Sequence, residues 1–112
     1  MEISFDNKRT RKLLESEKDL RRTFGAKVAK AVMKIMALLR AVDNLFELRQ
    51  WKSVRIHELK RERVGQFAVS IKEGNRLLLV PDHDPVPTRS DGRVDWNKIR
   101  RITIVGIVDY HD

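Results

Sequence analysis

The chain has 112 residues, of which 24 are Lys or Arg and 16 are Asp or Glu, so its formal net charge at pH 7 is +8. This length predicts a single domain, residues 1–112, that buries roughly two thirds of its unfolded surface around one core. The absence of cysteine excludes disulfides, thiolate zinc sites and cysteine nucleophiles. We therefore expect a cytoplasmic protein, and we find no apolar stretch long enough for a signal peptide or a membrane span.

The positive charge is concentrated in the first half of the chain. Residues 1–63 hold 17 basic and 9 acidic side chains, whereas residues 64–112 hold seven of each. If the elements of the first half share a face, we expect one basic surface there. Nucleic acid is the leading partner for such an asymmetry, and an acidic protein or an anionic membrane are the alternatives.

The first half predicts a short strand followed by two helices. Residues 1–5 alternate weakly, as an edge strand does, and Asp6 or Asn7 can cap a basic helix that runs to about residue 22. Gly25 breaks this helix, and a second helix is predicted over residues 26–48. Its apolar residues recur at three- and four-residue steps and need a sheet to cover. They are Val28, Val32, Ile35, Leu39, Val42 and Phe46.

The second half changes to a period of two, which is typical of strands. Residues 54–57 and 66–71 alternate, and a hairpin turn at residues 73–75 leads into a strand over 76–80. Residues 81–97 contain all three prolines and indicate a long surface loop, whereas residues 102–108 form an apolar, central strand. The order predicts an α+β fold, with the N-terminal strand and helix pair packed on a twisted, mostly antiparallel sheet of four to five strands.

Two groups of residues carry candidate chemistry. The first is the basic stretch around His57 and Lys60, which also holds Arg55, Arg61 and Arg63, and the second is Asp109-Tyr110-His111 after the last strand. A metal-free ribonuclease needs groups that exchange protons and fixed positive charge near the phosphate, and these residue types supply both. The alternative interpretations are a solvated charged turn and a frayed terminal tail.

Three further features are interpreted as structural. The carboxylates and histidine of the proline-rich loop resemble a metal site only superficially, so we predict no metal and no other cofactor. They are Asp82, His83, Asp84, Asp91 and Asp95. Trp51 and Trp96 are predicted to anchor a helix end and the loop to the core.

Residues 51–80 read W-K-S-V-R-I-H-E-L-K-R-E-R-V-G-Q-F-A-V-S-I-K-E-G-N-R-L-L-L-V, and V-D-Y-H follows near the end. This pattern resembles the HigB branch of the RelE/ParE toxin superfamily. The resemblance covers the order of elements, the H-E-L-K segment, the N-R pair after the hairpin and the closing D-Y-H. Toxins of that branch are the small basic halves of bacterial type II toxin-antitoxin pairs, and they cut mRNA on the translating ribosome without a metal.

The resemblance implies four catalytic residues, which are His57, Lys60, Asp109 and His111. Together with the basic stretch it gives a set of RNA-binding residues: Arg55, Arg61, Arg63, Arg76 and Tyr110. The expected reaction is attack of an RNA 2′-OH on the adjacent phosphate, which leaves a cyclic phosphate and a free 5′-OH. His111 or Asp109 is then the base and His57 the acid. Arg76 directly follows Asn75, where many relatives place a Trp between the two.

The same resemblance implies the partners. They are a HigA-type helix-turn-helix antitoxin and the 70S ribosome with its mRNA; a toxin-antitoxin heterotetramer is allowed, and no membrane is involved. Two rival functions stay open at this point. One is a gyrase poison of the ParE branch, which generally lacks the paired histidines. The other is a non-enzymatic RNA- or ribosome-binding module whose basic half supplies all of the function.

Overall fold

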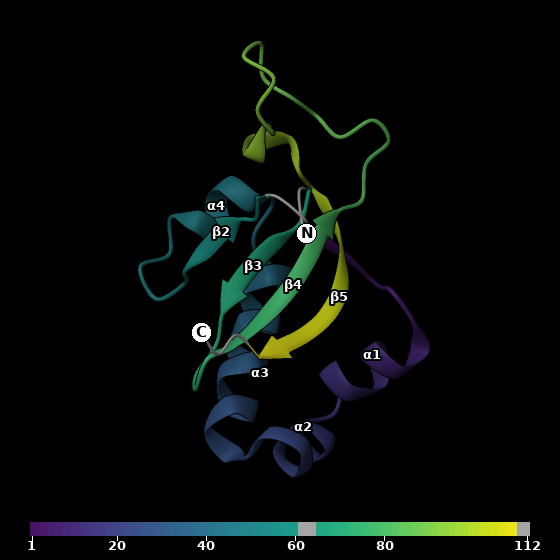
Figure 1. Ribbon diagram of the computed structural model, residues 1–112, viewed down its shortest axis with the longest axis vertical. Helices are drawn as coiled ribbons and strands as arrows, with labels where there is room; N and C mark the ends of the chain where they lie inside the picture. The colour runs from purple at the N-terminus through teal and green to yellow at the C-terminus, as the bar shows by residue number, and fades with distance from the viewer. Residues whose placement is uncertain (61–64, 110–112) are drawn as a thin grey trace.

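Five strands form one open sheet in the order β1-β5-β4-β3-β2 in the computed structural model, which describes residues 1–60 and 65–109 (Figure 1). Strand β1 (Glu2–Phe5) lies at one edge and pairs in parallel with β5 (Arg101–Asp109). The remaining pairs are antiparallel and involve β4 (Asn75–Pro81), β3 (Phe67–Ser70) and β2 (Ile56–Glu58). The predicted α+β fold and mostly antiparallel sheet are confirmed, and the observed strand bounds differ from the predicted ones by one or two residues.

Successive side chains of a strand point to opposite faces of the sheet, and among the described residues the helices pack on one face (Figure 1). On that face Phe67, Val69, Leu77, Leu79 and Ile104 belong to the hydrophobic core. Ala68 and Leu78 lie between these core residues in sequence and therefore point to the opposite face. Both are buried, but neither belongs to the core cluster. We call the side of the sheet to which they point the helix-free face.

The helix layer begins with two short helices where one was predicted. Helix α1 (Lys8–Leu14) is capped by Asn7, whose Oδ1 accepts a hydrogen bond from the backbone N–H of Thr10 at 2.8 Å. Ser16 has extended backbone, and its hydroxyl oxygen accepts from the N–H of Asp19 at 3.1 Å, which starts α2 (Glu17–Phe24). The prediction of a continuous helix was wrong because a serine cap satisfies N–H groups at a new helix start. Gly25, with φ +90°, separates α2 from α3 (Ala26–Ala41) as predicted.

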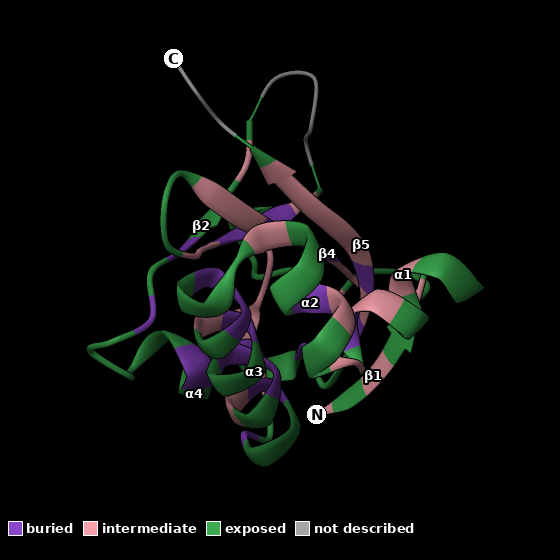
Figure 2. Ribbon diagram, turned by 90° about the horizontal axis from the view of Figure 1, so that it is seen from below, coloured by how far each residue is buried: buried purple, intermediate pink, exposed green. Residues whose placement is uncertain are grey.

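The predicted helix over residues 26–48 was wrong at its end. Helix α3 stops at Ala41, and α4 (Leu45–Arg49) is a separate helix. Asn44 Oδ1 accepts from the N–H of Glu47 at 2.8 Å, while Glu47 Oε2 accepts from the N–H of Asp43 at 3.0 Å. This reciprocal cap resets the helix, so Phe46 is 41 % exposed instead of joining the apolar stripe. Figure 2 shows that the helices of this layer carry both buried and exposed residues. Across the described ranges, none of the helices is both long and apolar enough to cross a membrane.

The β3–β4 hairpin and the long β4–β5 connection follow the predictions closely. The hairpin turns at Glu73 and Gly74, both with positive φ, and the N–H of Asn75 donates to the carbonyl of Lys72 at 3.2 Å. The connection spans residues 82–100 and contains an isolated bridge between Thr88 and Val94 and the short 3-10 helix η2 (Trp96–Lys98). It is the extended segment at the top of Figure 1.

The two tryptophans behave differently. The Trp96 ring and the buried Phe67 ring form a T-shaped pair with a centroid distance of 4.8 Å and an interplanar angle of 85°. The Arg49 guanidinium lies over the Trp96 ring, 5.0 Å from its centroid. Trp96 is thus an anchor, as predicted. Trp51 is 48 % exposed, so its predicted role as an anchor is wrong.

Candidate functional site

His57 is the middle residue of β2 and pairs with Ala68 of β3. Its neighbour Ile56 pairs with Val69 and enters the core, so strand alternation directs His57 to the helix-free face. The His57 side chain is exposed and makes no hydrogen bond or ion pair with residues 1–60 or 65–109. An imidazole in this position is accessible to a ligand lying on the sheet.

Arg76 lies on the same face as His57. It belongs to β4, where Leu77 and Leu79 enter the core, and it pairs with Ser70 of β3 and Val108 of β5. His57 and Arg76 are separated by two strand spacings and two residues, which corresponds to a backbone distance of about 12 Å. A ligand the size of a dinucleotide could contact both side chains.

Asp109 is not brought next to His57 by the sheet. It is the last residue of β5 and pairs with Asn75. Asp109 lies two residues after Ile107, which packs against the core, so alternation directs both to the face of the sheet that packs on the helices. Three strands and three residues separate it from His57, a backbone distance of roughly 15–20 Å. This geometry weighs against Asp109 taking the proton of a 2′-OH beside a phosphate that is held at His57.

The other sequence-predicted residues divide into two groups. Lys60 is exposed just beyond β2, and Arg55 is exposed just before it, with its carbonyl accepting the N–H of Ser70 at 2.9 Å. The predictions for four residues lie outside the described residues, and these are Arg61, Arg63, Tyr110 and His111. The described part of the basic stretch therefore contributes charge on both sides of His57.

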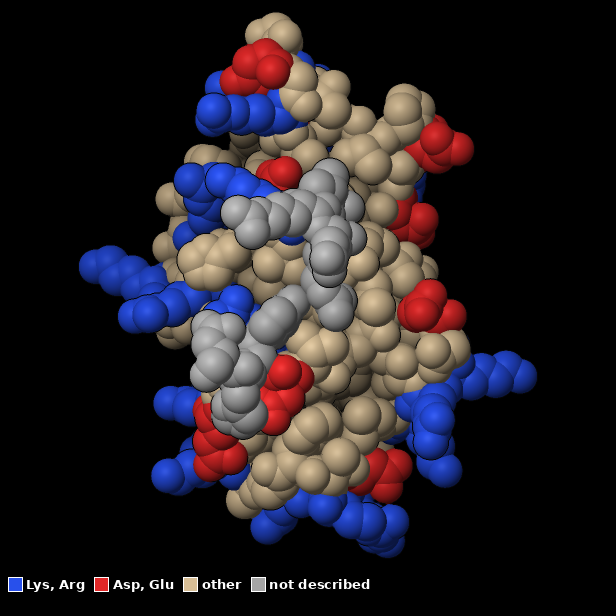
Figure 3. Space-filling model, viewed as in Figure 1, with Lys and Arg blue, Asp and Glu red and all other residues tan. Residues whose placement is uncertain are grey.

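The expected single basic surface is not seen on the helix-free face. Figure 3 shows Lys and Arg around the margin of this face, with Asp and Glu among them, and mainly uncharged atoms where the described centre is visible. Much of the positive charge lies in the helix layer instead, because α1, α2 and α3 together carry eleven Lys or Arg and two acidic residues. Charge on two layers points to more than one contact surface.

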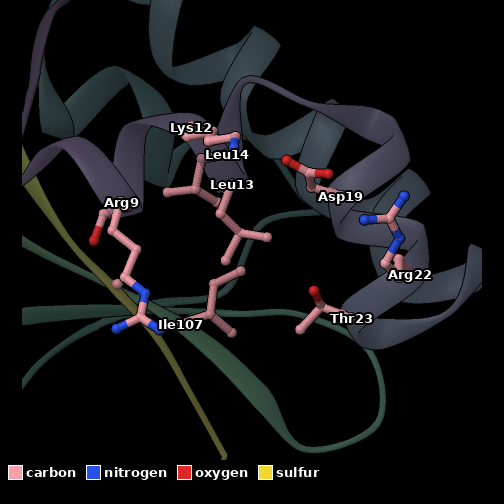
Figure 4. A pocket seen from close by; sticks show the side chains of 10 residues that line it. Arg9, Lys12, Leu13, Leu14, Asp19, Arg22, Thr23 and Ile107 are labelled. Carbon is pink, nitrogen blue, oxygen red and sulfur yellow. The ribbon is translucent and has the colours of Figure 1, made fainter.

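Two of the cavities between the helix layer and the sheet have charged linings. The first has a volume of about 580 Å³ and lies between α1, α2 and the end of β5. As Figure 4 shows, Leu13 and Ile107 project into it, while Arg9, Arg22 and Asp19 lie around it. The charge around this cavity is mixed and its interior is apolar. Neither His57 nor Arg76 lines it.

The second cavity has a volume of about 500 Å³ and lies between α3, the segment before β2 and the end of β3. Its charged residues come from three separate parts of the chain and are Lys34, Arg55 and Lys72. Sequence reasoning singled out only Arg55. Lys34 carried a weak signal, because it interrupts an otherwise apolar helix, and Lys72 carried none, because it borders a turn.

His83 has a structural role. Its Nε2 accepts hydrogen bonds from the backbone N–H groups of Arg100 and Arg101 at 3.0 and 3.2 Å, which ties the start of the long connection to the start of β5. Within the described ranges, no group of three or more His, Asp or Glu side chains is arranged to hold a metal ion. The interpretation of the Asp-rich loop as structural therefore has a specific basis in these two hydrogen bonds.

The chain was compared with protein-family models, with curated proteins and with solved structures, and nothing in any of the three matches it.

Proposed function

We propose that this chain is the toxin of a bacterial type II toxin-antitoxin pair and acts as a metal-free, ribosome-dependent mRNA endoribonuclease. The observation that carries the proposal is the placement of an exposed His57 and of Arg76 on the same helix-free face of an α+β sheet. This face holds two of the residues that the resemblance to HigB-type toxins assigns to RNA. A structural histidine would instead be buried or hydrogen-bonded, as His83 is.

The reaction breaks the bond between phosphorus and the 5′-oxygen of the following nucleotide. The 2′-OH attacks the phosphorus and loses its proton to a base, for which we take His111 because the strand register weighs against Asp109. His57 donates a proton to the departing 5′-oxygen. The products are a 2′,3′-cyclic phosphate and a 5′-OH, and each proton transfer contributes on the order of 100- to 10,000-fold in rate.

The positive side chains have a different role in this mechanism. The phosphate carries additional negative charge in the transition state, and fixed cations already in place stabilise that charge without reorganisation. Lys60 supplies a point charge, and Arg76 supplies a planar guanidinium that can contact two phosphate oxygens at once. Lys60 follows the end of β2, the strand that holds His57, and Arg76 belongs to β4.

The proposed activity requires two macromolecular partners. The ribosome presents mRNA to the helix-free face. An antitoxin binds the toxin and neutralises it until the toxin is released from the complex. An acidic antitoxin surface complements the excess of basic residues in the chain. Both partners place the protein in the cytoplasm.

The proposal is tested by inducible expression in a bacterium, with growth measured and the 5′ ends of a reporter mRNA mapped. The parent chain is compared with His57→Gln and His111→Gln. His83→Gln is the matched control, because His83 is the one histidine of the three to which the proposal gives no catalytic role. We expect growth arrest with new 5′ ends inside translated codons for the parent and for His83→Gln, and neither effect for the other two variants.

The possible outcomes separate the rival functions. Growth arrest without new 5′ ends, accompanied by loss of DNA supercoiling, would identify a gyrase poison. Arrest that survives replacement of both His57 and His111 would identify a binding module that blocks translation without cutting RNA. Either result would contradict the proposed ribonuclease.

A further inference from the structure

The cavity between α3, the segment before β2 and the end of β3 has an unusual charge composition. Three cations converge on it, Lys34 from α3, Arg55 from before β2 and Lys72 from the β3–β4 turn, and its lining within the described residues includes no Asp or Glu. We propose that this cavity is an anion site that binds a backbone phosphate of single-stranded RNA. We call it the cation pocket.

Within the part of the chain that the structure describes, the three cations have no partner that would neutralise them. Lys34, Arg55 and Lys72 form no ion pair and no side-chain hydrogen bond with residues 1–60 or 65–109, and all three are exposed. By contrast, Arg89 at the far loop is neutralised by Asp91 at 3.1 Å. Like charges that are brought together without an acid repel one another, and a bound anion removes this repulsion.

The uncharged lining of the cation pocket suits a nucleotide. The hydroxyl of Ser53 can donate a hydrogen bond to a phosphate oxygen beside the cations, and Ser70 also lines the cavity. The apolar atoms of Ile35, Leu38 and Ile71 line the same cavity and offer a surface on which a base can pack. The polar side of the pocket thus suits the phosphate, and its apolar side suits the base.

The position of the pocket connects it to the helix-free face. Arg55 precedes His57 by two residues, and its carbonyl is bonded to Ser70, which pairs with Arg76. Ser70, which lines the pocket, is thus the cross-strand neighbour of Arg76, and Arg55, which also lines it, lies two residues from His57. An RNA strand that lies across His57 can place a neighbouring phosphate in the cation pocket.

This inference rests on the proposed function for its choice of ligand, since the substrate there is single-stranded RNA. The same charges attract an acidic peptide as well, and RNA is chosen because the apolar side of the pocket offers a surface for a flat base beside the cations. The two ligands are therefore separated experimentally, in a binding assay that requires no cleavage.

The assay measures the affinity of a fluorescein-labelled, 2′-O-methylated RNA, which lacks the attacking 2′-OH, by fluorescence anisotropy between 50 and 200 mM salt. The test variant combines Lys34→Gln, Arg55→Gln and Lys72→Gln. The control variant removes the same charge from the other cavity and combines Arg9→Gln, Lys12→Gln and Arg22→Gln (Figure 4). Circular dichroism checks that both variants are folded, and single variants of Lys34 and Lys72 replace the triple variant if it is not.

Each phosphate contact contributes about 0.7 to the slope of log affinity against log salt for single strands. The pocket holds one phosphate, so we expect the test variant to lose about 0.7 from this slope, and over the measured range the parent loses about 3-fold more affinity than the variant. The control is expected to keep the parent slope, and a single variant is expected to lose part of this 0.7.

Two results would overturn the inference. An equal loss of slope in the test and control variants would show that net charge alone attracts RNA. A poly-glutamate peptide that displaces the RNA from the parent as effectively as unlabelled RNA does would assign the pocket to an acidic protein. The 2′-O-methylated RNA cannot be cleaved, so a failure of the ribonuclease proposal leaves this binding measurement unaffected.

Discussion

Trp96 ties the long β4–β5 connection to the core, and its replacement by Ala is expected to destabilise the whole domain. The ring is mostly buried, meets Phe67 edge-on at 4.8 Å and lies 5.0 Å from the Arg49 guanidinium. These contacts join three elements that are distant in sequence, namely η2, β3 and α4. Trp96→Ala therefore removes a junction between the loop, the sheet and a helix.

The expected loss follows from three contributions. An edge-to-face aromatic pair contributes about 0.5–1.5 kcal/mol beyond its buried area. A partly exposed cation–π contact contributes about 0.5–1 kcal/mol. Burial of a large apolar side chain contributes about 1.5–3 kcal/mol, and less where the ring is partly exposed. We therefore expect Trp96→Ala to lower the free energy of unfolding by about 2–4 kcal/mol, a large share of the roughly 5–15 kcal/mol available to a domain.

Urea unfolding followed by far-UV circular dichroism measures this loss. The chain offers its own control, because its second tryptophan, Trp51, is 48 % exposed. Trp51→Ala is expected to change the free energy of unfolding by about 0.5 kcal/mol or less. The conservative variant Trp96→Phe should recover part of the loss, because a phenyl ring can still pack against Phe67.

Equal destabilisation by Trp96→Ala and Trp51→Ala would refute this reasoning, because the two residues differ in burial and in contacts. A double-mutant cycle between Trp96→Ala and Phe67→Leu adds a second test. Its coupling energy should be about 0.5–1.5 kcal/mol, and additive effects would show that the ring contact contributes nothing of its own.

Three further substitutions test local backbone features by the same urea titration. Glu73→Asn is expected to stabilise the protein by about 0.5–1 kcal/mol, since Glu73 has φ +58° in the hairpin turn and Asn tolerates this conformation better; no gain would argue against strain there. Asn44→Ala should lower the free energy of unfolding by about 1 kcal/mol through loss of the α4 cap, and Asn44→Asp should restore it. Gly25→Ala should lower the free energy of unfolding by about 1–3 kcal/mol, because Gly25 has φ +90° and ψ 169°. An added Cβ meets no atom within 4 Å, so the loss comes from the backbone conformation alone, and an unchanged unfolding midpoint would contradict this argument.

The fold class could be predicted because its signals are local and periodic. Phe67 and Val69 enter the core while Ala68 between them points to the other face, and Val28, Val32 and Leu39 recur at helical steps. The break between α3 and α4 was missed although its signal was also local. The apolar spacing continues through Phe46, and this periodicity was given more weight than the capping pair of Asn44 and Glu47, which ends the helix.

The candidate site was predictable only in part. The direction of His57 follows from alternation once β2 is known to pair with β3, but a sequence does not state which residues of two strands face each other. The cation pocket depends even more on tertiary structure. Lys34 and Lys72 are brought beside Arg55 by the packing of α3 against the end of the hairpin, and no spacing in the chain encodes that contact.

The central claim, that His57 takes part in RNA cleavage, is tested most directly with purified components. Single-turnover cleavage of an mRNA on programmed ribosomes is followed for the parent, His57→Gln and the control His83→Gln, and the product ends are identified by mass. We expect a 2′,3′-cyclic phosphate from the parent, a rate at least about 100-fold lower for His57→Gln, and a nearly parental rate for His83→Gln. Cleavage by His57→Gln at the parental rate, or no cleavage by any of the three proteins, would contradict the proposed function.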